Sequence, residues 1–177
     1  MRPLRRLFGA PPRVPPALRR ANAWMAAGEY LAAAEAFERL ARGAETRRLP
    51  RAPHLYLRAG QARILAGETA QGMEHIRYGL EMLAARGQWP ALHRIGRRVV
   101  RELNERGLNA EAQQIETYLE ETLPEMPAGT PMSAARRKVT LPTHCPACGG
   151  PLRPDEVEWL DDVTAECAYC GSPVRGE

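Results

Sequence analysis

Four cysteines carry the clearest chemistry in this sequence of 177 residues, because they form two matched pairs near its C-terminal end. Each pair has the form Cys-x-x-Cys-Gly, with Cys145 and Cys148 in the first pair and Cys167 and Cys170 in the second. The 18 residues between the pairs are a spacing typical of sites in which four thiolates bind zinc. Four thiolates complete a tetrahedral shell, so the sequence predicts one Zn²⁺ ion with a structural rather than a catalytic role.

The elements that must position these cysteines are short. Residues 156–160 and 163–166 predict a β-hairpin, with Val157 and Trp159 alternating on one face. The segment 143–177 is too short to bury a stable core of its own, so metal binding and folding should form one equilibrium. The two cysteine pairs with this hairpin resemble a zinc ribbon, which implies a small β fold around the ion.

Other chemistries of four cysteines are less consistent with the pattern. Disulfides are disfavoured because no secretory signal is present. A dithiol oxidoreductase would need one pair on a thioredoxin-like scaffold. The Cys-Pro-x-Cys-Gly form also occurs in rubredoxin-like iron sites, so a redox protein remains an alternative, since tetrahedral geometry does not separate zinc from iron. His144 is a conceivable spare ligand, although four cysteines already fill the shell.

Residues 17–123 predict a mainly α region made of antiparallel helical hairpins. Gly28, Gly67 and Gly107 each separate two long helical runs, and their spacings of 39 and 40 residues indicate a repeat. The leading helix of each hairpin is expected before its glycine and the trailing helix after it. The leading helices are predicted at 17–27, 53–66 and 90–106, and the trailing helices at 29–42, 68–86 and 109–123.

The residues around the turn glycines recur at fixed offsets. They are Gly28, Tyr30, Ala33, Phe37 and Leu40 in the first hairpin, Gly67, Gly72, Ile76 and Gly79 in the second, and Gly107, Ala112 and Leu119 in the third. This pattern resembles the second half of a tetratricopeptide repeat, although Glu116 stands where the family has an apolar residue. The resemblance implies a solenoid that binds proteins and whose leading helices line a concave groove. Small residues at Ala33, Gly72 and Ala112 should let the paired helices approach closely.

The net charge is only +4, but the charges are distributed unevenly along the sequence. The leading helices carry nine arginines and two glutamates, the trailing helices four arginines and ten glutamates, and residues 143–177 two arginines and seven acids. If the leading helices line a groove, that groove is basic and suits carboxylate or phosphate groups. The candidate partner-binding residues are Arg58, Arg63, Arg94, Arg97, Arg98 and Arg101. The alternative is that these arginines belong to solvated faces with ordinary i,i+4 ion pairs.

The sequence contains no motif of a known catalytic type, and its histidines are scattered singly. We therefore expect no enzyme but a protein-interaction adaptor, which binds an acidic protein segment in the groove. A nucleic-acid-associated factor that uses the basic helices is the alternative. Direct contact between nucleic acid and residues 143–177 is disfavoured, because an acidic segment repels phosphate.

Two further segments complete the expected organisation. Residues 1–16 form a basic, proline-rich tail, either solvated or a weak anchor to a membrane surface or proline-binding partner, and residues 124–142 form a linker. No apolar run is long enough to span a membrane, and no secretory signal is present, so a cytoplasmic protein without integral membrane association is expected. The acidic segment 143–177 is predicted to dock on the basic groove of its own chain.

Overall fold

The computed structural model describes most of the chain, with gaps near the N-terminus, in the linker and within the cysteine-rich segment. The described residues are 15–123, 139–146, 149–154, 157–159, 163–167, 170 and 173–176. The expected tail and most of the expected linker therefore lie outside the described residues. Within this described part, no helix combines the length and the apolar character that crossing a membrane requires.

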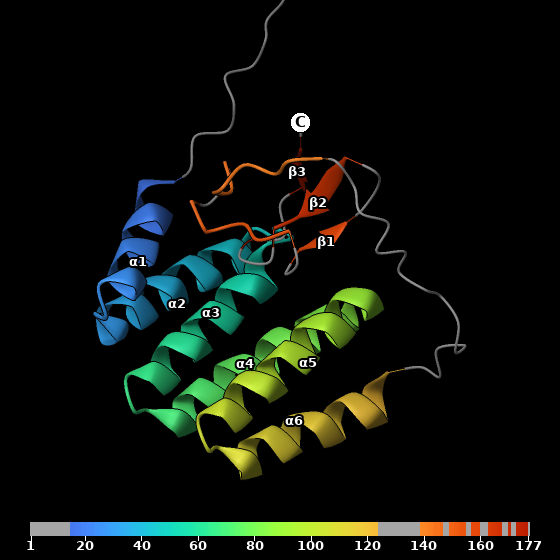
Figure 1. Ribbon diagram of the computed structural model, residues 1–177. Coiled ribbons are helices and arrows are strands. Elements are labelled where there is room, and N and C mark those ends of the chain that lie inside the picture. Colours follow the sequence, from blue (N-terminus) through green and yellow to red (C-terminus); the bar gives the residue numbers. More distant parts are fainter. Residues whose placement is uncertain are drawn as a thin grey trace, which may run out of the picture.

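Six helices make up most of the described structure and follow one another as antiparallel pairs (Figure 1). They lie close to the ranges predicted from the apolar periodicity and the turn glycines, so the mainly helical part of the expected fold class is confirmed. The helices are α1 (Pro16–Ala26), α2 (Tyr30–Thr46), α3 (Ala52–Leu65), α4 (Thr69–Ala85), α5 (Trp89–Glu105) and α6 (Asn109–Thr122).

A glycine with positive φ follows the first helix of each pair. Gly28, Gly67 and Gly107 have φ angles of 79°, 86° and 74°, a region that side chains with a Cβ rarely adopt. The amide that follows then reaches back to the helix, as from Glu68 N to Arg63 O at 2.9 Å. This hydrogen bond satisfies a carbonyl that the end of the helix would leave without a partner. The three predicted helix breaks are confirmed.

Helices α3 and α4 touch through their backbones. A Cβ added at Gly60 would lie 2.6 Å from Gly72 O, and one added at Gly72 would lie 2.8 Å from Gly60 O. Neither position has room for a side chain, because real Cβ atoms do not approach so closely. The close approach expected at Gly72 is therefore confirmed, and the equivalent residues Ala33 and Ala112 are also buried.

The described residues between 139 and 176, called the cysteine module below, contain a small antiparallel sheet. Its strands β1 (Glu158–Trp159), β2 (Thr164–Glu166) and β3 (Pro173–Arg175) are ordered β1-β2-β3. Trp159 pairs with Ala165 across β1 and β2, which confirms the predicted hairpin. The third strand was not predicted, because three residues beginning with proline show no alternation of polar and apolar side chains.

The described residues form two hydrophobic cores. The first core joins the cysteine module to α1, α2 and α3, whereas the second core joins α4, α5 and α6 (Figure 1). Leu141, which the sequence placed in the linker, is buried in the first core together with Leu18 and Leu55. The cysteine module is therefore seated on the helical region and covers part of the α1–α3 surface, while the docking of the acidic segment on a basic groove stays a prediction.

Candidate metal centre and basic cleft

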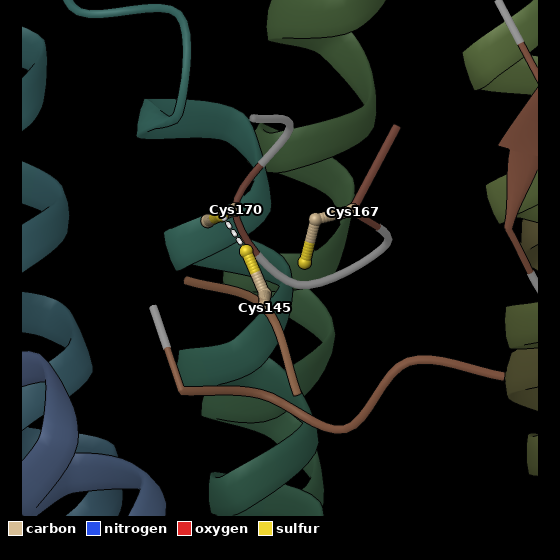
Figure 2. Close-up of side chains that lie close together, drawn as sticks. All are labelled: Cys145, Cys167 and Cys170. Atoms are coloured by element: carbon tan, nitrogen blue, oxygen red, sulfur yellow. Dashed lines mark hydrogen bonds between the residues drawn. The ribbon is translucent and has the colours of Figure 1, made fainter. Parts of the chain in front are cut away.

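Three cysteines of the cysteine module meet in its interior (Figure 2). Their Sγ atoms all lie within 4.8 Å of one another, and the Sγ atoms of Cys145 and Cys170 are 3.8 Å apart. The side chains of Cys145, Cys167 and Cys170 are buried, and all three cysteines are free of disulfides. Cys148, the fourth predicted ligand, lies outside the described residues.

The geometry of this cluster fits a tetrahedral metal ion. With metal–sulfur bonds of about 2.3 Å, neighbouring sulfurs of a tetrahedral site lie about 3.8 Å apart. The Cys145–Cys170 separation of 3.8 Å has this value. Thiolate donors suit zinc or iron, and a bound cation would compensate their charge in a buried site. The three cysteines could therefore hold a metal ion.

A tight turn positions Cys145. The amide of Cys145 donates to Gly150 O, and the amide of Gly149 donates to Cys145 O, both at 2.8 Å. Gly149 has a φ of 70°, a backbone conformation that residues with a Cβ rarely adopt, so this turn favours glycine. The Nδ1 atom of the exposed His144 lies 3.1 Å from Thr143 Oγ1. Among the described residues, His144 is not part of the metal-ligand cluster.

A cleft of about 490 Å³ lies between α3 and α5 and reaches the cysteine module. Both helices contribute side chains spaced three or four positions apart, as expected when one face of each helix turns toward the cleft. Positive charge dominates the described lining, which includes five arginines and two glutamates. These residues are Arg58, Arg98, Arg101, Arg106 and Arg153, with Glu102 and Glu105.

Three of the six candidate partner-binding arginines line this cleft, namely Arg58, Arg98 and Arg101. The guanidinium of Arg58 stacks over the Phe37 ring at 5.2 Å, and its Nη1 donates to Gln61 Oε1 at 2.7 Å. These contacts hold the Arg58 side chain, which belongs to α3, in one orientation. Arg98 and Arg101 approach the same cleft from α5, so the structure brings these three candidates together.

The other three candidates are not among the residues that line the cleft. Arg97 is exposed on α5, and its Nη1 lies 3.8 Å from Glu116 Oε1 of α6. Arg94 is half-buried on the same helix. Arg63 of α3 instead contacts carboxylates of α2 and of the α3–α4 turn. The charge of the leading helices is thus divided between the cleft and other surfaces.

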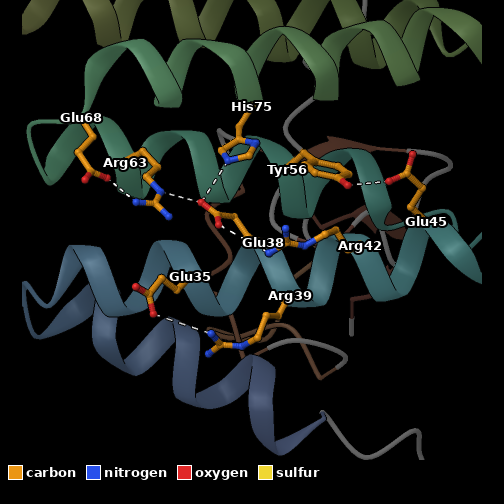
Figure 3. Close-up of polar contacts among 9 residues, drawn as sticks. All are labelled: Glu35, Glu38, Arg39, Arg42, Glu45, Tyr56, Arg63, Glu68 and His75. Carbon is orange, nitrogen blue, oxygen red and sulfur yellow. Dashed lines mark hydrogen bonds and ion pairs between the residues drawn. The ribbon is translucent and has the colours of Figure 1, made fainter.

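Arg63 takes part in a polar network that joins α2, α3 and α4 (Figure 3). Its Nε donates to Glu38 Oε1 at 2.6 Å, and its Nη1 donates to Glu68. His75 Nε2 lies 3.1 Å from the same Glu38 oxygen. Burial opposes the charge of Glu38, but Arg63 and His75 outweigh it and lower the pKa of this carboxyl. The Glu38 and Glu68 carboxylates in turn raise the pKa of Arg63.

His54 lies where the cleft meets the cysteine module. Its side chain on α3 is only 3% exposed, and its Nε2 is 3.5 Å from Glu166 Oε1 of β2. Among the described residues, the buried Nδ1 atom has no hydrogen-bond partner, and His54 lines the cleft.

In comparisons with known proteins, no family model, no curated protein and no solved structure matches the chain. The resemblance to tetratricopeptide repeats and zinc ribbons therefore depends on the residues already described. The features of the structure that bear on function are the cysteine cluster and the cleft.

Among the cleft residues that the sequence did not single out are His54, Arg106 and Arg153. His54 looked isolated, yet it precedes Arg58 and Gln61 by four and seven positions, and this spacing could have placed it on their face of α3. Arg106 follows Arg101 at the end of α5 and was not selected. Arg153 gave no signal, because it belongs to an acidic segment whose position on the helices is a tertiary property.

Proposed function

We propose that this protein is a non-enzymatic interaction adaptor, in which a tetratricopeptide-like helical scaffold carries a structural zinc ribbon. In this proposal the cleft between α3 and α5 binds an acidic segment of a partner protein. The observation that carries it is the charge of the cleft, whose described lining includes five arginines and two glutamates. Guanidinium groups suit this ligand because they donate paired hydrogen bonds to a carboxylate.

The contacts of the α5 arginines support such a role. The ion pairs from Arg98 to Glu102 and from Arg101 to Glu105 are 3.9 and 4.0 Å long and lie within one helix. Long i,i+4 pairs of this kind contribute little, so an incoming carboxylate can compete for both guanidiniums. The volume of about 490 Å³ is typical of ligand sites, and it suits a few side chains of an extended segment.

For the metal, we propose zinc bound by Cys145, Cys148, Cys167 and Cys170. Metal analysis of the purified full chain should find one zinc ion per chain, and the protein should be colourless. Ferric tetrathiolate absorbs strongly in the visible range, so stoichiometric iron with such a spectrum would favour the rubredoxin-like alternative.

The cleft is tested with a short fluorescent peptide rich in Glu and Asp, titrated with the full chain by anisotropy. Arg98→Ala should weaken binding about tenfold, because a hydrogen bond to a charged group contributes about 1.5–3 kcal/mol. Arg97→Ala is the matched control. It removes the same charge from the next position of the same helix, but the Arg97 side chain is 65% exposed and outside the cleft.

Three outcomes would count against the proposal. Equal losses in the two variants would show that general charge, not the cleft, attracts the peptide. Equal binding of a neutral peptide would show that the cleft does not select acidic segments. Tight, salt-dependent binding of single-stranded or duplex DNA in place of the peptide would favour the nucleic-acid alternative.

A further inference from the structure

The cysteine module forms part of the wall of the basic cleft. Arg153, which precedes β1, lines the cleft together with α3 and α5. On β2, the carboxylate of Glu166 lies 3.5 Å from Nε2 of the buried His54. The cleft is therefore assembled from two parts of the chain that are far apart in sequence.

Each of these two module residues is next to a buried anchor. Leu152, which precedes Arg153, is 7% exposed in the first core, and its amide donates to Thr143 O at 2.9 Å. Cys167, which follows Glu166, is fully buried in the cysteine cluster. The positions of Arg153 and Glu166 thus depend on the packing that the cysteine cluster organises.

Within the described residues, the cysteine module is held by the cysteine cluster and by the packing of Leu152, Val157 and Val174 in the first core. Its described strands are two or three residues long, and short strands without a large core are marginal in water. In small metal-binding segments the free energy of metal binding is the free energy of folding. Loss of the metal should therefore release Arg153 from the cleft and Glu166 from His54.

We propose that metal binding at the cysteine cluster and acidic-ligand binding in the α3–α5 cleft are coupled, because the metal-loaded module completes the wall of the cleft. The ligand in this inference is the one assigned in the proposed function. By thermodynamic reciprocity, the ligand raises the metal affinity by the same factor by which the metal raises the ligand affinity.

The sign of the coupling follows from the nearest groups and not from the net charge of the module. Residues 143–177 carry seven acids and two arginines, so net charge alone predicts that releasing the module would strengthen the binding of an acidic ligand. Within the described structure, however, the module side chain that lines the cleft is Arg153, whereas the Glu166 carboxylate faces His54. Removal of the metal should therefore weaken binding.

The test measures the affinity of the same acidic peptide for the full chain before and after the metal is removed with a chelator. We expect a loss of at least about fivefold, the lower end of typical coupling between sites. In the metal-loaded chain, Arg153→Ala should also weaken binding severalfold. Arg175→Ala removes the same charge from an exposed position of β3 outside the described cleft lining, and should not weaken binding.

The outcomes separate this inference from the proposed function. Equal or tighter peptide binding after metal removal would overturn the coupling and leave the cleft intact as a binding site. If the metal-loaded chain did not bind the peptide, the proposed function would fail and the coupling with it. If metal removal unfolded the whole chain, equal effects of the Arg153 and Arg175 variants would still overturn the inference.

Discussion

The two hydrophobic cores of this protein are built from side chains of different size. Among the described residues, ten of the 21 buried residues in the first core are alanines, against two of 12 in the second. A buried leucine or isoleucine contributes about 1.5–3 kcal/mol, and an alanine contributes much less. The second core of α4–α6 can thus be stable through its own aliphatic side chains, whereas the first core needs other support.

Two kinds of support are present in the first core. Small residues let the helices of this region approach closely, which replaces bulky side chains by backbone contact. The cysteine module adds a second layer, with Leu152, Val157 and Val174 buried in the same core. The comparison leads us to expect that the first core depends on a metal bound at the cysteine cluster, and that the second core does not.

Metal removal should have the largest effect on stability. It should destabilise the cysteine module and the first core, and leave the second core folded. Treatment with a chelator, or Cys167→Ser, should destabilise the cysteine module by roughly 10 kcal/mol, the scale of structural zinc binding. Amide hydrogen exchange should accelerate in the module and in α1, and remain slow in α4–α6. Far-UV circular dichroism should keep most of its helical signal.

Uniform acceleration of exchange across all six helices would contradict the division into two cores. No change in the module would show that the cysteines are not its main support. The Arg175→Ala variant serves as the control, since the Arg175 side chain is exposed and is not part of the cysteine cluster.

The next largest effect is expected where the two cores meet, between α3 and α4. In Gly72→Ala, the new Cβ would lie 2.5 Å from Ile64 Cγ1 and 2.8 Å from Gly60 O. The carbonyl belongs to the backbone, so the helices must separate. We expect a loss of about 3 kcal/mol in the free energy of unfolding, the upper end for overpacking, measured by urea denaturation.

Gly43→Ala is the matched control for this substitution. Gly43 is inside α2, and a Cβ added there would have no neighbour within 4 Å. Alanine should therefore stabilise the chain by about 0.5–1 kcal/mol, because glycine inside a helix costs conformational entropy. Similar losses in both variants would show that the close contact of α3 and α4 is not the cause.

The elements with a strong periodic signal were predictable from the sequence. The six helices follow from apolar spacing and from glycines such as Gly67, whose conformation is a local property. The β1–β2 hairpin follows from Val157 and Trp159. The division into two cores was not predictable, because it depends on which surface of α1–α3 receives the cysteine module, and no local pattern encodes that choice.

The same limit applies to the candidate site. Cysteine spacing indicates a shared site because each Cys-x-x-Cys turn is encoded by neighbouring residues. Three of the four cysteines do meet in the described structure. The arginines behave differently, since Arg58 and Arg63 lie on one helix but face different neighbours. A difference of five positions rotates a side chain away from the cleft, so counting charge along a helix could not separate the two roles.

The polar network across α2, α3 and α4 should have a moderate effect. Glu38→Gln removes a charge whose side chain is 12% exposed and lies against Arg63 and His75, with Arg42 at 3.9 Å. We expect a loss of about 2 kcal/mol at neutral pH, as for hydrogen bonds to charged groups.

The pH dependence of this variant has a definite sign. The pKa of Glu38 is lowered in the folded chain from an ordinary value of 4.5, so its stabilisation is fully present above that pH. The difference between the wild-type chain and Glu38→Gln should shrink as the pH falls below about 4.5. Glu35→Gln on the same helix, with a 55% exposed side chain paired to Arg39, should show almost no loss and no such trend. A constant difference between pH 3 and 7 would contradict the assigned role of Glu38.

The smallest expected effects concern two tyrosines that donate to one carboxylate. Tyr56 Oη donates to Glu45 Oε2 at 2.6 Å from a side chain that is 6% exposed, and Tyr78, which is 40% exposed, donates to Oε1. Tyr78→Phe should cost about 0.5 kcal/mol and Tyr56→Phe about 1 kcal/mol, since water can replace the more exposed hydroxyl. Both variants keep the edge-to-face ring contact at 4.8 Å.

The pKa of Glu45, measured by NMR titration, is a second way to compare Tyr56→Phe with Tyr78→Phe. The hydrogen bonds from Tyr56 and then Tyr78 are the largest causes that lower the pKa of Glu45. Its pKa should therefore rise in both variants, and more in Tyr56→Phe than in Tyr78→Phe. The reverse order would contradict the assigned strengths of the two hydrogen bonds to Glu45.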